Sequence, residues 1–254
     1  MLGKFNSDTA ALQRRENLNA ALAARDLDAW IVERTAPQAG ERVLDIGCGT
    51  GKQVFHLARR IGNLDILGID ISEDAVAAVR RRAGADGVPG VAAKRIGIDE
   101  CVDRLAPASF DLILSTYAIY YASDVAATMR RLAQLARPGG RAFLSGPGAG
   151  TNRELIAIVR AVAADDAVIA DIDDFLAAEQ IAAAGRQWGA VALHRLDNEI
   201  AFPSAAAVLD WWRNHNSYRP EIENGVAAAL AQVVAREGSF RLTKNVLGIS
   251  LQRP

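Results

Sequence analysis

Short apolar runs alternate with amphipathic segments along the first 145 residues of the chain. Strands are predicted by the runs at 42–46, 66–70, 91–96, 110–114 and 141–145. Between them apolar residues recur at helical spacing, as at Val54, Leu57 and Ile61, and a further helix is predicted at 124–136. Strands that alternate with helices are typical of a parallel sheet covered on both faces.

Helical periodicity dominates the chain after residue 147. Helices are predicted at 152–164, 173–184, 204–214 and 221–236, strands at 191–201 and 246–251, and two earlier helices within 8–35. The last two strands can complete the same sheet, because no linker separates them from the preceding strands. We therefore predict a single α/β domain over 1–254. Its parts are a helical cap at about 1–40, a core at about 41–146, and C-terminal strands with substrate-side helices at about 147–254.

Composition narrows the class of protein. Half of the 254 residues are apolar, and 29 basic side chains nearly cancel 30 acidic ones, which leaves a net charge of -1. This balance is that of an ordinary globular protein and gives no positive field for a nucleic acid. No apolar run approaches the roughly 18 residues that span a bilayer, and the N-terminus has no hydrophobic signal segment, so a cytoplasmic location without membrane contact is expected. Cys48 and Cys101 lack metal-site spacing, and neither a disulfide nor a metal is expected.

The segment 43–52 carries the clearest chemistry. Its glycines fall at alternate positions, Gly47, Gly49 and Gly51, and Asp45 lies two residues before the first. A dinucleotide loop instead spaces its glycines as G-x-G-x-x-G and brings backbone amides to a pyrophosphate. A carboxylate at Asp45 would repel phosphate, but it can help to hold an ammonium group while glycine amides at a helix start face a small zwitterionic tail.

Asp70 ends the next predicted strand, 19 residues after Gly51. A carboxylate at this place accepts hydrogen bonds from a ribose diol. The ligand should therefore combine an amino-acid tail with a nucleoside, and S-adenosylmethionine fits that description.

With these residues the chain resembles the class I S-adenosylmethionine-dependent methyltransferases over about 42–145. The matching motifs are Asp45-Ile-Gly47-Cys-Gly49-Thr-Gly51 for the first motif, Gly68-Ile-Asp70-Ile71-Ser72 for the ribose-binding strand end, and Phe110-Asp111 with Leu135-Ala-Arg-Pro-Gly-Gly140 for the later strands and turn. The resemblance implies a Rossmann-like, mostly parallel seven-stranded sheet with helices on both faces and a helical roof over the crevice. The cofactor-binding residues that it implies are Asp45, Gly47, Cys48, Gly49, Gly51, Asp70, Ile71, Asp99, Glu100 and Ser115.

Asp99 lies where many members of this family carry the acid that contacts the adenine amino group, eleven residues before Phe110. The usual Leu-Pro-Phe after that acid is missing here, and Asp103 and Arg104 stand near its place. The adenine pocket therefore departs from the family pattern, and Asp99 read alone is also compatible with an ordinary loop carboxylate.

Aromatic and polar residues supply the candidates for the acceptor side. Tyr117, Tyr120 and Tyr121 follow the fourth predicted strand, where ligands of such sheets bind. We assign Tyr120 to positioning, because a tyrosine of ordinary pKa is a poor base at neutral pH. His215 is the candidate general base, although a histidine at a helix C-terminus is equally compatible with a structural role. Trp211 and Tyr218, which lie beside it in sequence, are further candidates for binding the acceptor.

These observations predict a methyltransferase for a small acceptor that carries a hydroxyl or an amine. The fourth strand continues as Ser115-Thr116-Tyr117-Ala118 and lacks the Asn/Asp-Pro-Pro-Tyr/Phe motif of nucleic-acid methyltransferases, which also use a Pro-Cys nucleophile that is missing here. A non-catalytic S-adenosylmethionine-binding protein and a nicotinamide-dependent oxidoreductase remain as alternatives. Neither the acceptor nor the oligomeric state follows from the sequence.

Overall fold

The computed structural model describes residues 9–163, 175–176, 180, 187–215 and 217–254, without the side chains of residues 9, 11 and 12. These residues form two compact units. Unit 1 consists of Met1–Leu27, Pro147–Asp173 and Leu196–Val246, and unit 2 of Asp28–Gly146, Asp174–Arg195 and Leu247–Pro254, each as far as described. The expected single domain with three consecutive parts stays a prediction.

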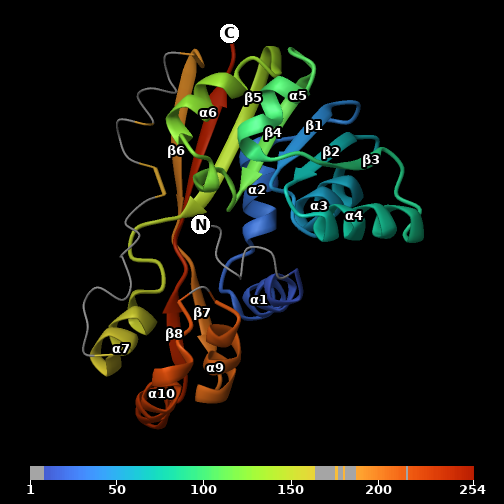
Figure 1. Ribbon diagram of the computed structural model, residues 1–254. Coiled ribbons are helices and arrows are strands. Elements are labelled where there is room, and N and C mark those ends of the chain that lie inside the picture. The colour runs from blue at the N-terminus through green and yellow to red at the C-terminus, as the bar shows by residue number, and fades with distance from the viewer. Residues whose placement is uncertain (1–8, 164–174, 177–179, 181–186, 216) are drawn as a thin grey trace. The chain divides into compact units, whose positions relative to one another are not determined.

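Unit 2 is built on a seven-stranded sheet with the order β3-β2-β1-β4-β5-β9-β6 (Figure 1). The strands are β1 (Arg42–Ile46), β2 (Asp65–Asp70), β3 (Val91–Arg95), β4 (Phe110–Thr116), β5 (Ala136–Pro147), β6 (Ala190–Leu196) and β9 (Val246–Gln252). The pairs β3–β2, β2–β1, β1–β4 and β4–β5 are parallel. This confirms the predicted mostly parallel seven-stranded sheet, and it places the carboxyl ends of β1, β2 and β4 along one edge.

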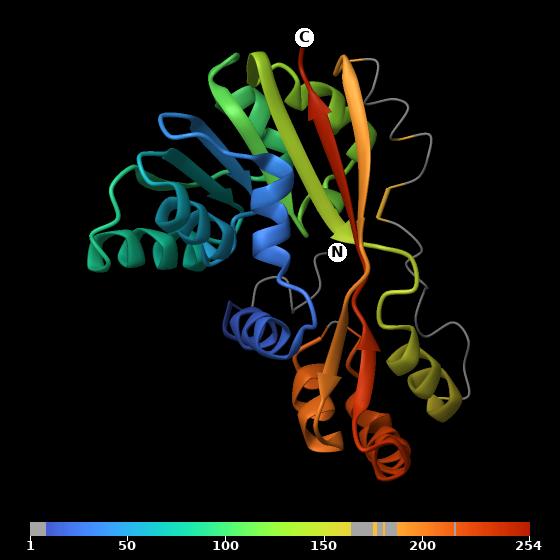
Figure 2. The same ribbon diagram turned by 180° about the vertical axis from the view of Figure 1, so that it is seen from behind.

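Helices cover both faces of this sheet, as Figures 1 and 2 show from opposite sides. They are α2 (Leu27–Thr35), α3 (Lys52–Ile61), α4 (Glu73–Ala85), α5 (Cys101–Arg104) and α6 (Val125–Leu132). Met129 of α6 packs in a buried cluster with Leu44 of β1 and Leu144 of β5. Trp30 of α2 meets Phe143 with 5.5 Å between ring centroids. Because neighbouring side chains of a strand point to opposite faces, α2 and α6 lie on opposite sides of the sheet.

The predicted helix at 124–136 is shorter in the structure, and the strand after it is longer. Asp124 caps the start of α6 by accepting the N–H of Ala127 at 2.8 Å, and the helix ends at Leu132. Ala136 already pairs with Phe110, so β5 begins five residues before the predicted start at residue 141. Pairing with β4 therefore ends the helix earlier than its apolar periodicity indicates.

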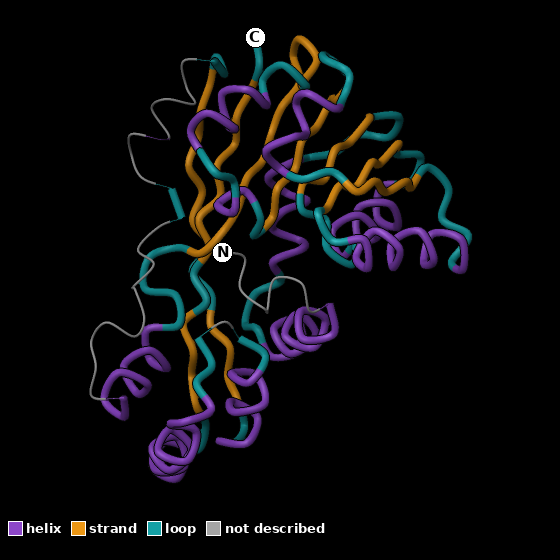
Figure 3. Tube along the Cα trace, in the orientation of Figure 1, coloured by secondary structure: helices purple, strands orange, loops and turns teal. Residues whose placement is uncertain are grey.

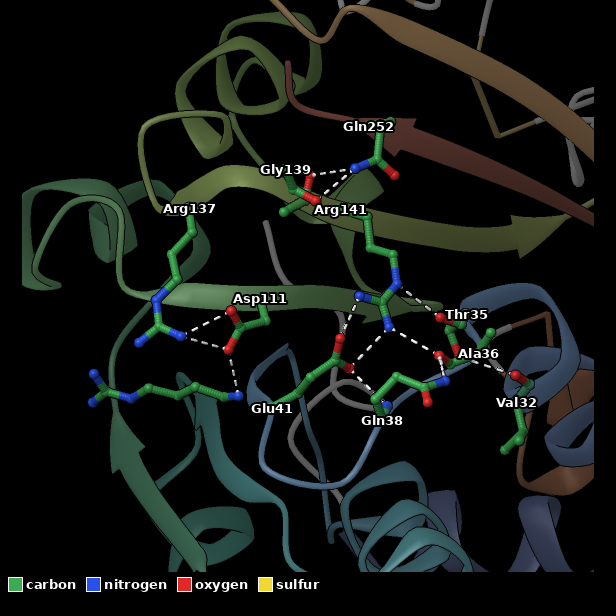
Figure 4. A network of polar contacts seen from close by, with 12 residues as sticks. Val32, Thr35, Ala36, Gln38, Glu41, Asp111, Arg137, Gly139, Arg141 and Gln252 are labelled. Atoms are coloured by element: carbon green, nitrogen blue, oxygen red, sulfur yellow. Dashed lines mark hydrogen bonds and ion pairs between the residues drawn. The ribbon is translucent and has the colours of Figure 1, made fainter.

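Hydrogen bonds from an arginine of β5 hold the segment between α2 and β1 (Figure 4). Arg141 donates to both carboxylate oxygens of Glu41 at 2.7 and 2.9 Å, and to the carbonyl oxygens of Thr35 at 2.8 Å and Ala36 at 3.1 Å. Burial raises the pKa of Glu41, but the hydrogen bonds from Arg141 and from the N–H of Gln38 outweigh it, so this pKa lies below its ordinary value. The network joins β5 to the end of α2.

Unit 1 has a separate core around a two-stranded antiparallel sheet (Figure 3). Its elements are α1 (Thr9–Leu22), α7 (Arg153–Ala163), β7 (Glu199–Phe202), α9 (Ala205–Arg213), α10 (Glu223–Glu237) and β8 (Phe240–Thr243). Their buried side chains include Phe202, Trp211, Trp212, Val226 and Leu242. This core is independent of the seven-stranded sheet.

The strand prediction for the C-terminal half needs correction. The strand predicted at 191–201 is two strands, because it is interrupted between Leu196 and Glu199 and the two parts pair in different sheets. The short strand β8 was not predicted. The helix predicted at 173–184 falls almost entirely outside the described residues.

Candidate functional site

The glycine-rich turn after β1 has a backbone that only glycine adopts readily. Gly47 has φ +72° and donates its N–H to the carbonyl oxygen of Ile69 at 2.8 Å. A Cβ on Gly47 would lie 2.2 Å from the Cβ of Ala118. Gly51 has φ +85° and begins α3. These glycines therefore let the turn pass close to the segment after β4 and lead directly into a helix.

Asp70 connects this turn to the end of β2. Its Oδ2 accepts the N–H of Gly49 at 2.9 Å, and its Oδ1 accepts the N–H of Ser72 at 2.9 Å. Ser72 in turn caps α4 by accepting the N–H of Ala75 at 3.3 Å. The sequence indicated the position of Asp70 at the strand end but not this clamp, which depends on a contact across the sheet.

Asp45 lies at the centre of the candidate site with only 2 % of its surface exposed. Burial, and then the negative charge of Asp70, raise its pKa to about 7. Two acids held this closely favour a positively charged group beside them, since a cation stabilises both carboxylates. The ammonium group of an amino-acid tail meets that requirement.

Ser115 and Cys48 line the same strand ends and are buried. The Oγ of Ser115 donates to the carbonyl oxygen of Ile46 at 3.1 Å. The thiol of Cys48 packs so closely on Gly68 that a Cβ there would lie 2.8 Å from its Sγ. Burial and the charges of Asp45 and Asp70 raise the pKa of Cys48 well above its ordinary value. A thiol in this state packs as a small apolar group and is a poor nucleophile.

Three candidate residues for the adenine side are exposed. Ile71 has 54 % of its surface exposed directly after Asp70. The Oδ1 of Asp99 accepts the N–H of Ser123 at 3.0 Å, so this acid also holds the chain after β4. Glu100 forms an ion pair with Arg104 at 3.0 Å.

The tyrosines after β4 form an aromatic group with a residue that the sequence did not indicate. Tyr120 lies 4.6 Å from Tyr121 and 6.2 Å from Phe175, measured between ring centroids. Phe175 packs against Gly146 at the end of β5, where a Cβ would lie 2.8 Å from its ring. Tyr117 has φ +56°, and such strain in a non-glycine residue concentrates at functional sites. No local pattern announces Phe175, because it is brought there by tertiary folding.

The other candidate residues lie in unit 1. Trp211 is fully buried and donates its indole N–H to the amide oxygen of Asn19 at 2.7 Å. The hydroxyl of Tyr218 donates to the carboxylate of Glu223, which raises the pKa of Tyr218. The structure thus divides the candidates: the cofactor residues and Tyr117, Tyr120 and Tyr121 belong to unit 2, while His215, Trp211 and Tyr218 belong to unit 1.

His215 stacks on Trp211, with 4.7 Å between ring centroids and 20° between the planes. Its Nδ1 accepts the N–H of Ser217 at 3.2 Å, so the ring proton lies on Nε2. Burial, and then the positive charges of Lys244 and Arg15, hold the pKa of His215 well below its ordinary value. The imidazole is therefore neutral at pH 7.

The part of the chain that the structure describes has neither a cluster of metal ligands nor a membrane-spanning helix. No group of three or more His, Cys, Asp or Glu side chains in this part of the chain could hold a metal ion. No helix within it is long and apolar enough to cross a membrane.

Comparison with known families decides between the alternatives. The family description "Methyltransferase domain" matches residues 37–192, which is more than half of the chain. The chain belongs to the class I S-adenosylmethionine-dependent methyltransferases. The family's cofactor is S-adenosylmethionine, and the carboxylates of Asp45 and Asp70 suit its ammonium group and its ribose hydroxyls.

Two curated relatives and one solved structure are similar to this methyltransferase. It is 32 % identical over 132 residues to the ubiquinone biosynthesis O-methyltransferase of Acinetobacter baumannii (strain AYE), with 52 % of this chain and 54 % of that protein covered. The chain thus spans about half the length of that relative. It is 31 % identical over 229 residues to the nocamycin O-methyltransferase of Saccharothrix syringae, covering 82 % and 81 %. The Haemonchus contortus phosphoethanolamine N-methyltransferase 2 in complex with S-adenosyl-L-methionine matches with a TM-score of 0.62 at 18 % identity, covering 97 % of this chain and 57 % of that one, which shows the shared fold.

Proposed function

We propose that this methyltransferase transfers the methyl group of S-adenosylmethionine to an oxygen or nitrogen atom of a small-molecule acceptor. The observation that carries the proposal is the buried Asp45 beside Asp70 at the glycine turn, a set that suits an amino-acid tail joined to a nucleoside. The relatives named ubiquinone biosynthesis O-methyltransferase and nocamycin O-methyltransferase support a small acceptor. The near-neutral charge gives no support to a nucleic-acid substrate.

The residues of unit 2 have distinct tasks in this proposal. S-adenosylmethionine supplies a methyl group made electrophilic by its sulfonium, so the protein mainly has to bind, orient and exclude water. Asp45 holds the ammonium group of the zwitterionic tail beside the glycine turn, and Asp70 accepts hydrogen bonds from the ribose. Asp99 offers its second carboxylate oxygen to the adenine amino group. Cys48, Gly51, Ser115, Ile71 and Glu100 complete the predicted contact set.

The acceptor side rests on the aromatic group after β4. Tyr117, Tyr120 and Tyr121 would form a wall that orients the acceptor and excludes water, with the hydroxyl of Tyr120 as a hydrogen-bond donor. Removal of a proton by His215 stays a prediction, because the free ring carries its proton on Nε2 and its Nδ1 lone pair is engaged by Ser217. Trp211 and Tyr218 stay candidate acceptor residues. A cytoplasmic location also stays a prediction.

A screen with isotopically labelled methyl donor tests this function. Purified protein is incubated with labelled S-adenosylmethionine and separate pools of hydroxylated quinone precursors, phenols, organic acids and amines, and label in the acceptor is measured. Transfer by the native protein and its loss in Gly49→Val, whose branched side chain would restrict the turn, support the proposal. Tight cofactor binding without transfer to any pool would favour a non-catalytic binding protein.

A further inference from the structure

Arginines on the surface of unit 1 are paired with carboxylates. Arg14 meets Asp210 at 2.9 Å, and Arg241 meets Glu199 at 2.6 Å. Pairing of this kind is the usual arrangement of cations on a protein surface, and it leaves little charge for a ligand. Two other cations of the same unit differ from these arginines in their partners.

Arg15 and Lys244 are held by neutral acceptors instead. Arg15 donates to the carbonyl oxygen of Asn214 at 3.0 Å, and Lys244 donates to the amide oxygen of Asn152 at 3.0 Å. Neither side chain forms an ion pair among the described residues, and both are partly exposed. No carboxylate of the described residues therefore neutralises these two side chains.

Lys244 lies beside the buried Trp211 indole, and Arg15 is bound to the helix end next to it. The Nζ of Lys244 is 5.1 Å from the centroid of the Trp211 ring. Arg15 is anchored at Asn214, the residue next to His215, whose ring stacks on Trp211. Helix α1 and the residue after β8 thus each bring a positive group to the neighbourhood of the Trp211–His215 pair.

The pKa shifts of this group agree with like charges that lie near one another. Burial, and then the charge of Arg15, lower the pKa of Lys244 to about 7. The same two cations, after burial, lower the pKa of His215. Holding like charges together costs free energy, and an anion between them removes that cost.

We propose that Arg15 and Lys244 form a binding site for the anionic oxygen group, carboxylate or phosphate, of a small acid. A guanidinium and an ammonium suit such a group, since each donates charge-assisted hydrogen bonds to its oxygens. The site goes beyond the proposed methyl transfer and does not depend on it. A purely structural role, in which Lys244 only holds Asn152 in its left-handed conformation at φ +62°, predicts no anion binding.

Calorimetric titration at pH 7 with sodium citrate and with inorganic phosphate tests the site and separates the two anion classes. We expect one or both to bind the native protein, and affinity to fall by at least about tenfold in Lys244→Met and in Arg15→Met. Arg14→Met is the matched control, because Arg14 is the preceding residue of α1 and is already paired with Asp210. It should change affinity by less than about twofold. Circular dichroism confirms that each variant is folded.

Two further readouts keep the outcome clear. Affinity should fall as the pH rises from 7 to 9, because Lys244 loses its proton in this range while a guanidinium such as that of Arg15 stays charged and His215 is already neutral. Failure of both anions to bind, or equal binding by Lys244→Met and Arg14→Met, would overturn the proposal. S-adenosylmethionine is titrated into the same samples, so a loss of the cofactor binding that the proposed function needs is seen separately.

Discussion

The carboxylate of Asp70 accepts the backbone N–H of Gly49 at 2.9 Å, across the gap between the turn after β1 and the end of β2. The same side chain is our candidate for the ribose contact. One residue thus fixes the shape of the glycine turn and, in our proposal, also binds the cofactor. Preorganisation of this kind lowers the entropy that binding must overcome.

Replacement of Asp70 by alanine should therefore affect both binding and stability. We expect affinity for S-adenosylmethionine to fall by about 10- to 100-fold, through loss of about 1.5–3 kcal/mol of charge-assisted hydrogen bonds. The free energy of unfolding should also fall, by about 1–3 kcal/mol, as the N–H groups of Gly49 and Ser72 lose their acceptor. Calorimetry and urea unfolding measure the two effects. Asp74→Ala, which removes an exposed acid of α4, is the control, and an equal loss of affinity in both variants would show that Asp70 is not a ribose ligand.

Two glycine-to-alanine variants separate a constrained glycine from an unconstrained one. Gly47→Ala should lower the free energy of unfolding by about 2–4 kcal/mol, because the new methyl group meets Ala118 and the residue has φ +72°. Gly84→Ala in α4 should be neutral or stabilising by up to about 1 kcal/mol, since nothing lies within 4 Å of the added Cβ. Thermal unfolding of both variants tests this ranking. Equal stability of the two would show that the tight approach of the turn to Ala118 is not important.

The raised pKa of Asp45 makes cofactor binding depend on pH. Below about 7 the free protein holds Asp45 protonated, and an ammonium group prefers the charged carboxylate. Affinity for S-adenosylmethionine should therefore rise by about tenfold between pH 5.5 and 7.5 and become flat in Asp45→Asn. In the free protein the native state keeps a proton that the unfolded state loses above 3.8, so the free energy of unfolding contributed by Asp45 falls as pH rises from about 4 to about 7. A flat affinity profile in the native protein would contradict the ammonium contact.

Two substitutions probe the acceptor side once an acceptor is found. His215→Ala should lower turnover by about 100-fold if the ring takes a proton from the acceptor, and Tyr120→Phe should lower it less. Affinity for S-adenosylmethionine should hold in both variants. The pH dependence of turnover is the discriminating readout, because loss of a general base also removes the acidic limb of the profile. Full turnover of His215→Ala at every pH would leave His215 with a structural role.

The continuous apolar runs predicted the central strands of unit 2 well. A strand such as Arg42–Ile46, buried along most of its length, shows a local signal that tertiary contacts reinforce. The sequence pattern does not separate β7 from β6. The two polar residues between these strands do not indicate that the strands belong to different sheets. Strand β8 has only four residues and depends on its pairing with β7.

The candidate site was predictable where chemistry follows the chain. Asp45, the glycines and Asp70 form motifs of fixed spacing, and the structure brings them to one end of the sheet. Phe175 and the cations Arg15 and Lys244 gave no such signal, because their neighbours come from distant segments. Residues brought together only by tertiary folding leave no periodic trace in one sequence.

The most direct test of the central claim is a calorimetric titration of the purified chain with S-adenosylmethionine and, in a separate cell, with NADH. The buried Asp45 and the alternate glycines predict saturable binding of S-adenosylmethionine with one site per chain, and no binding of NADH, whose pyrophosphate Asp45 would repel. Saturable binding of NADH with no heat from S-adenosylmethionine would contradict the account.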